Sequence, residues 1–70
     1  MTRFYAEQHL PRGSADSVWV VVDNEAPRGN GIIVTVDPNA LLTDERDSMA
    51  LAKLVAVHLN AQKFKPIYAE

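Results

Sequence analysis

The chain has 70 residues, of which 47% are hydrophobic and 23% charged, with a formal net charge of −2 and no cysteine. This length suits one domain, residues 1–70, and the composition is typical of a folded chain. The mild acidity argues against binding nucleic acid through a general basic surface. No apolar run approaches the roughly 20 residues that cross a membrane, and the first residues lack the apolar core of a signal peptide, so we expect a cytoplasmic protein.

Two strands joined by a turn are predicted in the first third of the chain. Residues 3–9 alternate in side-chain character, as strands do. Residues 10–16 contain a proline, a glycine, two more turn-forming side chains and no apolar run. Residues 17–23 are filled with β-branched and aromatic side chains, which favours a strand.

The second strand is apolar on both of its sides. Alternate residues point in opposite directions: Val18, Val20 and Val22 to one side, Trp19 and Val21 to the other. After a hairpin-type connection at residues 24–30, the third predicted strand, residues 31–36, repeats this pattern: Ile32, Val34 and Val36 on one side, Ile33 and Thr35 on the other. Since one helix covers one face of a small sheet, the other face should be covered by the tails, by a second copy or by another protein, unless it stays an exposed patch.

Residues 43–62 form the predicted helix, because they contain no glycine or proline and are rich in helix formers. Thr43 can cap its start, and Asp37 followed by Pro38 offers an alternative start. At about 100° per residue, one broad side is made of Ala50, Leu51, Leu54, Val57, His58 and Ala61, with Val55 and Leu59 at its edge. We expect this side to cover the sheet. The opposite side carries Met49, Ala52 and Ala56, which form a second contact surface unless alanine is only a neutral helix former there.

The C-terminal residues 63–70 contain Pro66 among apolar and aromatic side chains. They are predicted to form an extended tail packed on the domain or an edge strand, where proline is tolerated. Phe64, Ile67 and Tyr68 are therefore candidates to cover the open face of the sheet, in the same copy or in a neighbour.

No catalytic, cofactor or metal site is predicted. The serines lie in no nucleophile motif, and the carboxylates of Asp44, Glu45 and Asp47 are explained by the start of the helix. His58 and His9, without a cysteine or a fixed carboxylate spacing, make a poor zinc site. Dispersed arginines and aromatics would bind nucleic acid only if the fold gathered them on one face: Arg3, Arg12, Arg28, Tyr5 and Trp19. We therefore do not expect an enzyme.

The order strand, strand, strand, helix, with WVVVDN, then GIIVTVD and a helix ending in LVAVHLNAQ, resembles small phage and prophage proteins built from a β-meander and a terminal helix. The resemblance implies no shared activity, but small phage proteins of this size commonly bind and inhibit a host protein. The same order is similar to antitoxin domains of the HicB type. The Phe-Pro-Asp-x-Pro-Gly segment that typically follows their second strand is replaced here by residues 24–30.

The sequence thus predicts an α+β domain, a three-stranded antiparallel sheet with one C-terminal helix on one face. We expect a non-enzymatic protein-binding module without cofactor, which self-associates, a dimer being favoured, and which binds a host protein. The alternative is an antitoxin-like or regulatory subunit that reaches nucleic acid through a partner. The residues predicted to form the partner interface are Trp19, Val21, Ile33, Met49, Ala52, Ala56, Phe64, Ile67 and Tyr68.

Overall fold

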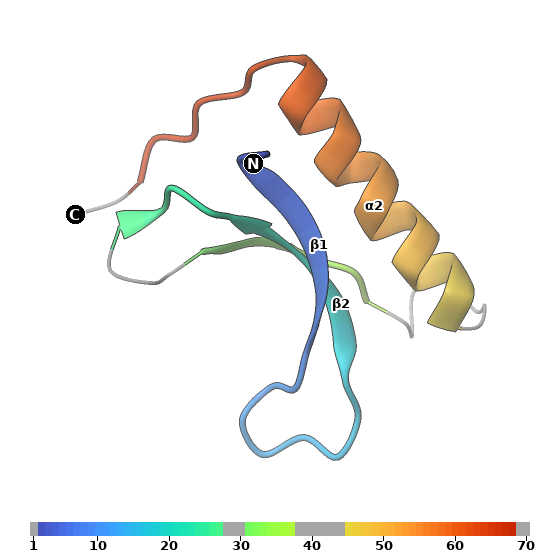
Figure 1. The fold of residues 1–70 in the computed structure, drawn as a ribbon. Helices are drawn as coiled ribbons and strands as arrows, with labels where there is room; N and C mark the ends of the chain where they lie inside the picture. The colour runs from blue at the N-terminus through green and yellow to red at the C-terminus, as the bar shows by residue number, and fades with distance from the viewer. Residues whose placement is uncertain (1, 28–30, 38–44, 69–70) are drawn as a thin grey trace.

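Three strands are followed by one long helix in the computed structural model, which describes residues 2–27, 31–37 and 45–68. The elements are β1 (Phe4–His9), β2 (Val18–Asp23), β3 (Ile32–Thr35) and α2 (Glu45–Ala61). The strands form one antiparallel sheet in the order β1-β2-β3, and α2 lies across one face of it, mainly over β1 and β2 (Figure 1). This confirms the predicted α+β fold. The predicted helix starts at Thr43 and at Asp37-Pro38 involve residues outside the described ranges.

A β-bulge in β3 changes which of its side chains face the helix. Val21 of β2 pairs with Val34, and Val22 pairs with Ile32, so Ile33 is an extra residue in β3. Ile33 and Val34 both pack against the core below α2, whereas Ile32 is on the other face and 41% exposed. The predicted alternation, with Ile32 and Val34 on one side, is therefore wrong, because a bulge shifts the two-residue period by one.

The core lies between the sheet and the side of α2 that carries its small residues. The buried cluster consists of Phe4, Val21, Val36, Ala52 and Ala56. Ser48 of α2 is also buried, at 4% exposure. Three helix residues that face the sheet are thus serine or alanine, spaced one turn apart. We call Ser48, Ala52 and Ala56 the inner face of α2.

The prediction that the broad apolar side of α2 covers the sheet is wrong. Leu54 is 65% and Val57 64% exposed, while Ala52 is completely buried. The sheet already supplies large side chains to the core, among them Phe4 and Trp19. A helix that approaches such a surface closely must present small residues, because interiors pack to a fixed density and leave no room for a second large layer.

The face of the sheet opposite α2 needs no second layer over its central strand. Val20 is fully buried and Val22 is 8% exposed, although α2 lies on the other side. Val20 has Glu7 and Thr35 as its cross-strand neighbours, and Val22 has Tyr5 and Ile32. The side chains of both flanking strands thus lie beside the valines between them. The two-sided apolarity of β2 is therefore accounted for within one copy.

The C-terminal end of α2 is tied to the start of β1. The side-chain amide of Asn60 accepts a hydrogen bond from the Phe4 backbone N–H and donates one to the Phe4 carbonyl, both at 2.9 Å. The helix then ends in a Schellman motif, in which Lys63 has φ 52° and the Phe64 N–H donates to the Leu59 carbonyl at 3.1 Å. The rings of Phe4 and Phe64 have centroids 6.1 Å apart. These contacts fix the position of α2 relative to the sheet.

Candidate binding surfaces

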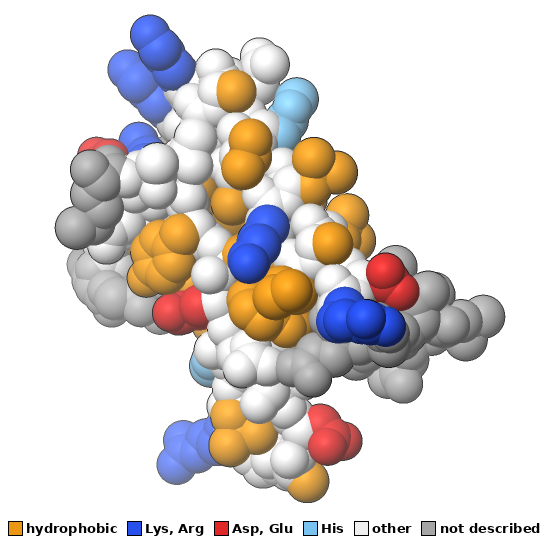
Figure 2. All heavy atoms as spheres, turned by 45° about the vertical axis from the view of Figure 1, so that its right-hand side comes forward, with side chains coloured by type: hydrophobic (Ala, Val, Ile, Leu, Met, Phe, Trp, Pro, Cys, Tyr) orange, Lys and Arg blue, Asp and Glu red, His pale blue; other side chains and the backbone are white. Residues whose placement is uncertain are grey.

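Two leucines and a valine of α2 point away from the sheet. Leu51 is 38% exposed and lies one turn from Leu54 and two from Val57 and His58, on the side of the helix opposite Ala52 and Ala56. Figure 2 shows hydrophobic side chains spaced along this side of the molecule, with basic side chains beside them. We call the following set the outer face of α2: Ala50, Leu51, Leu54, Val57, His58 and Ala61. All six are exposed.

An apolar groove of about 580 Å³ lies beside α2, over β3. It exists because the helix lies mainly over β1 and β2, so that the helix side of β3 is only partly covered. Ile67, which is 99% exposed, lies at this groove, and Phe64 is 45% exposed. We call it the β3 groove, and its lining residues are Ile32, Ile33, Val34, Val55, Leu59, Phe64, Pro66, Ile67 and Tyr68.

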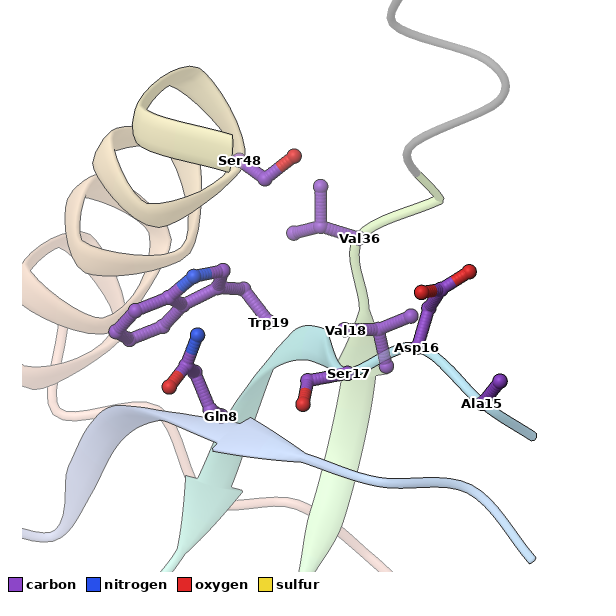
Figure 3. Close-up of a pocket in the computed structure, with 8 residues that line it drawn as sticks. All are labelled: Gln8, Ala15, Asp16, Ser17, Val18, Trp19, Val36 and Ser48. Carbon is purple, nitrogen blue, oxygen red and sulfur yellow. The ribbon is translucent and has the colours of Figure 1, made fainter. Parts of the chain in front are cut away.

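A second hollow of about 380 Å³ lies at the other end of the sheet, where β2 begins and α2 starts. Figure 3 shows the indole of Trp19 between α2 and β1, with Gln8 beside it, and Ser48 reaching from the helix toward Val36. Trp19 Nε1 and Ser48 Oγ are buried and have no hydrogen-bond partner among the residues that the structure describes. A buried polar group without a partner costs about 1–3 kcal/mol, so a polar group entering this hollow would be bound favourably by either atom.

A buried polar cluster holds the N-terminal and C-terminal segments at the end of β2. Arg3 donates from Nε to Asp23 Oδ1 at 2.8 Å and from Nη2 to Oδ2 at 3.1 Å. The Glu25 backbone N–H and the Tyr68 hydroxyl also donate to the Asp23 carboxylate. The hydrogen bonds from Arg3 lower the pKa of Asp23 to about 2, against the effect of burial, which alone would raise it. Burial, together with the bond to Asp23, raises the pKa of Tyr68.

This cluster is structural, because every oxygen of the carboxylate is occupied and Asp23 is only 2% exposed. Nearby, Gly31 approaches β2 so closely that an added Cβ would lie 2.8 Å from Val22 Cγ1. The Asp23 N–H donates to the Gly31 carbonyl at 2.7 Å. Glycine at this position therefore allows the close contact that sets the β2–β3 register.

The structure divides the predicted interface residues into three groups. Val21, Ala52 and Ala56 are buried in the core, so they cannot form a surface for a partner, and their prediction is corrected. Trp19 and Ile33 also pack against the core, and Met49 is half-buried. The tail residues are more accessible: Phe64 and Ile67 are exposed, and Tyr68 is half-buried against Asp23.

The outer face of α2 is the surface that sequence reasoning assigned to the wrong side. Its residues were grouped correctly by their period, but the grouping alone does not say which side meets the sheet. A usable signal was residue size: Phe4, Trp19 and the valines of β2 already make a full layer, which favours alanines opposite them.

The described residues offer no other chemical centre of the kinds considered above. They contain no group of three or more His, Asp or Glu side chains arranged to hold a metal ion. Of the arginines considered for nucleic acid, Arg3 is engaged with Asp23 and Arg12 lies in the turn after β1, while Arg28 is outside the described ranges. Within residues 2–27, 31–37 and 45–68, no helix has the length and hydrophobicity required to span a bilayer.

Comparisons with protein-family models, with curated proteins and with solved structures find no match for this chain.

Proposed function

We propose that this chain is a non-enzymatic protein-binding module and that the outer face of α2 is its contact surface. The observation that supports this is the distribution of side-chain size around the helix. Alanines fill the inner face, while Leu54 and Val57 remain about two-thirds exposed at 65% and 64%. Burying a leucine or valine side chain stabilises by about 1.5–3 kcal/mol, so a partner on this face would recover free energy that the isolated fold leaves unused.

The resemblance to small phage proteins extends this proposal to a host protein as one partner. The alternative, a regulatory or antitoxin-like subunit, would use the same face to bind the partner that contacts nucleic acid. The pairing of Arg3 with Asp23 favours such an indirect contact over a direct one, because this guanidinium is already bidentate to a carboxylate.

The test compares the wild-type chain with the double variant Leu54→Gln/Val57→Gln, which makes the outer face polar at nearly constant size. Each is expressed with one tag beside an untagged copy in the producing cell, captured, and quantified by mass spectrometry. We expect the wild type to retain a protein at stoichiometric amounts, either a second copy or a different chain, and the double variant to lose it.

Lys53→Gln is the matched control, because Lys53 precedes Leu54, is exposed, and lies about 100° away around the helix. It should retain whatever the wild type retains. Recovery of the same protein by the double variant would place the contact elsewhere, and recovery of only the tagged chain in every case would overturn the proposal.

A further inference from the structure

The outer face of α2 has the spacing of a helix that pairs with another helix. Around Leu54, the positions spaced alternately by three and four residues are Asp47, Ala50, Val57 and Ala61. All lie within about 60° of Leu54 at about 100° per residue. All are exposed. A seam of this kind, with the largest side chain in the middle and alanines on either side, allows two helices to approach closely.

One polar residue of this seam and one beside it lie toward its opposite ends. Asp47 is in the first turn of α2, and His58 is in the last turn. Two parallel helices would place Asp47 against the same residue of the other copy, and like charges side by side are destabilising. Two antiparallel helices centred on Leu54 place Asp47 close to His58 of the other copy, where an imidazole N–H can donate a hydrogen bond to the carboxylate.

The charge distribution along the sequence favours the same orientation. Three of the four residues at 44–47 are acidic, whereas every charged residue at 53–65 is a lysine. Antiparallel pairing therefore sets an acidic end beside a basic end twice, once at each end of the pair. The helix macrodipoles are also opposed in this arrangement, which is the favourable one.

We propose that the partner on the outer face is a second copy of this chain, with the two α2 helices antiparallel and Leu54 at the two-fold axis. This inference rests on the proposed function and names the occupant of the same surface. In this arrangement residues face each other when their numbers add to about 108 and they lie on the same side of Leu54 around the helix, so Leu51 meets His58 and Ala50 meets Val57 of the other copy. The face is then self-complementary, as a two-fold interface requires.

The area of the helix–helix contact limits the expected affinity of the dimer. A helix of 17 residues is about 25 Å long at about 1.5 Å per residue. A single helix pair of this length covers less than the roughly 800 Å² per partner of a standard stable interface. We therefore expect a reversible dimer with a dissociation constant in the micromolar range.

The absence of cysteine from the chain makes disulfide trapping specific. Ala50→Cys and Val57→Cys are prepared as separate single variants, mixed, and oxidised. The antiparallel pair brings position 50 of one copy to position 57 of the other, so the mixture should cross-link while each variant alone should not. A parallel pair would cross-link each variant with itself, because the two positions are then each opposite their own copy. That result would overturn the proposed orientation.

Sedimentation equilibrium from micromolar to millimolar concentration tests the dimer itself. The wild type and Lys53→Gln should pass from monomer to dimer, and Leu54→Gln/Val57→Gln should stay monomeric at every concentration. The fluorescence of Trp19, the one tryptophan in the sequence, reports that each variant is folded, because Trp19 packs on the inner side of α2.

The outcomes separate this inference from the proposed function. A wild type that stays monomeric, yet captures a different protein through Leu54 and Val57, would overturn the second copy and leave the protein-binding surface standing. A wild-type dimer that persists in the double variant would overturn both, because the contact would then lie elsewhere. A monomer that captures nothing would likewise overturn both.

Discussion

The two faces of α2 differ in residue size and in what they contact. The inner face, Ser48, Ala52 and Ala56, is buried against large side chains of the sheet, whereas Leu51, Leu54 and Val57 on the outer face remain accessible. A helix is usually expected to bury its most apolar side. Here the fold buries the smaller side, because the sheet supplies the volume. Size complementarity between the sheet and α2 therefore outweighs the hydrophobicity of the helix side chains in deciding which side is buried.

The largest effect on stability is expected when a residue of the inner face is enlarged. Ala52→Leu inserts three heavy atoms at a fully buried position and should cost about 3 kcal/mol of unfolding free energy, because overpacking forces neighbouring side chains apart. Leu54→Ala on the outer face should change the stability of the monomer by less than about 0.5 kcal/mol. Urea unfolding at low protein concentration, followed by Trp19 fluorescence, measures both. Equal losses for the two variants would show that the faces are assigned incorrectly.

The next effect concerns the contact that fixes which face meets the sheet. Asn60→Ala removes both side-chain hydrogen bonds to the Phe4 backbone and should destabilise by about 2 kcal/mol, because Phe4 is buried and its backbone groups lose their partner. The same urea experiment measures the loss. Gln62→Ala, two residues further on and exposed, serves as the control and should stay near the wild type.

A smaller effect is expected from acid, at the end of the sheet where Asp23 joins Arg3 and Tyr68. The pKa of Asp23 is lowered from 3.8 to about 2 in the folded chain, chiefly by the hydrogen bonds from Arg3. A lowered folded-state pKa contributes stability that is present above about pH 4 and is lost as the pH falls toward 2. The contribution of the Asp23 charge to stability is measured by comparing the urea midpoints of the wild type and Asp23→Asn at several values from pH 6 to pH 2.5.

That difference should shrink as the pH falls below about 4, since protonation then removes the same charge that the substitution removes. Other carboxylates titrate in both proteins and cancel in the difference. A constant difference across this range would show that the Asp23 charge does not stabilise the fold.

The smallest expected effect has the opposite sign. Ser48→Ala removes a buried hydroxyl that has no partner within residues 2–27, 31–37 and 45–68 and replaces it with the best helix former, so it should stabilise by up to about 1 kcal/mol. Lys53→Ala at an exposed helix position measures the contribution of helix propensity alone. A loss of stability in Ser48→Ala would indicate that the hydroxyl is hydrogen-bonded in the hollow beside Trp19. The inner face would then bind a polar group as well as the apolar core.

The elements themselves could be predicted from the sequence. Alternating side chains and turn residues predicted three strands, and a stretch without glycine or proline predicted the helix, each within two residues of the observed ends. These features are local: they depend on the period of apolar residues and on backbone preferences over a few positions. The tail residues Phe64 and Ile67 are exposed, and their role as contact residues stays a prediction.

The tertiary structure decided which side of α2 faces the sheet and which side stays exposed. The sequence of α2 allows either side to meet a sheet, and only the layer formed by Phe4, Trp19 and Val21 selects the alanines. The bulge at Ile33 likewise places Ile32 and Ile33 on the faces opposite to those predicted, and no local sequence pattern indicates it. The contacts that hold this arrangement join residues far apart in the chain, Phe4 to Asn60 across 56 positions and Arg3 to Asp23 across 20. Local patterns fix the elements, but packing volume and distant hydrogen bonds fix which side of the helix stays exposed.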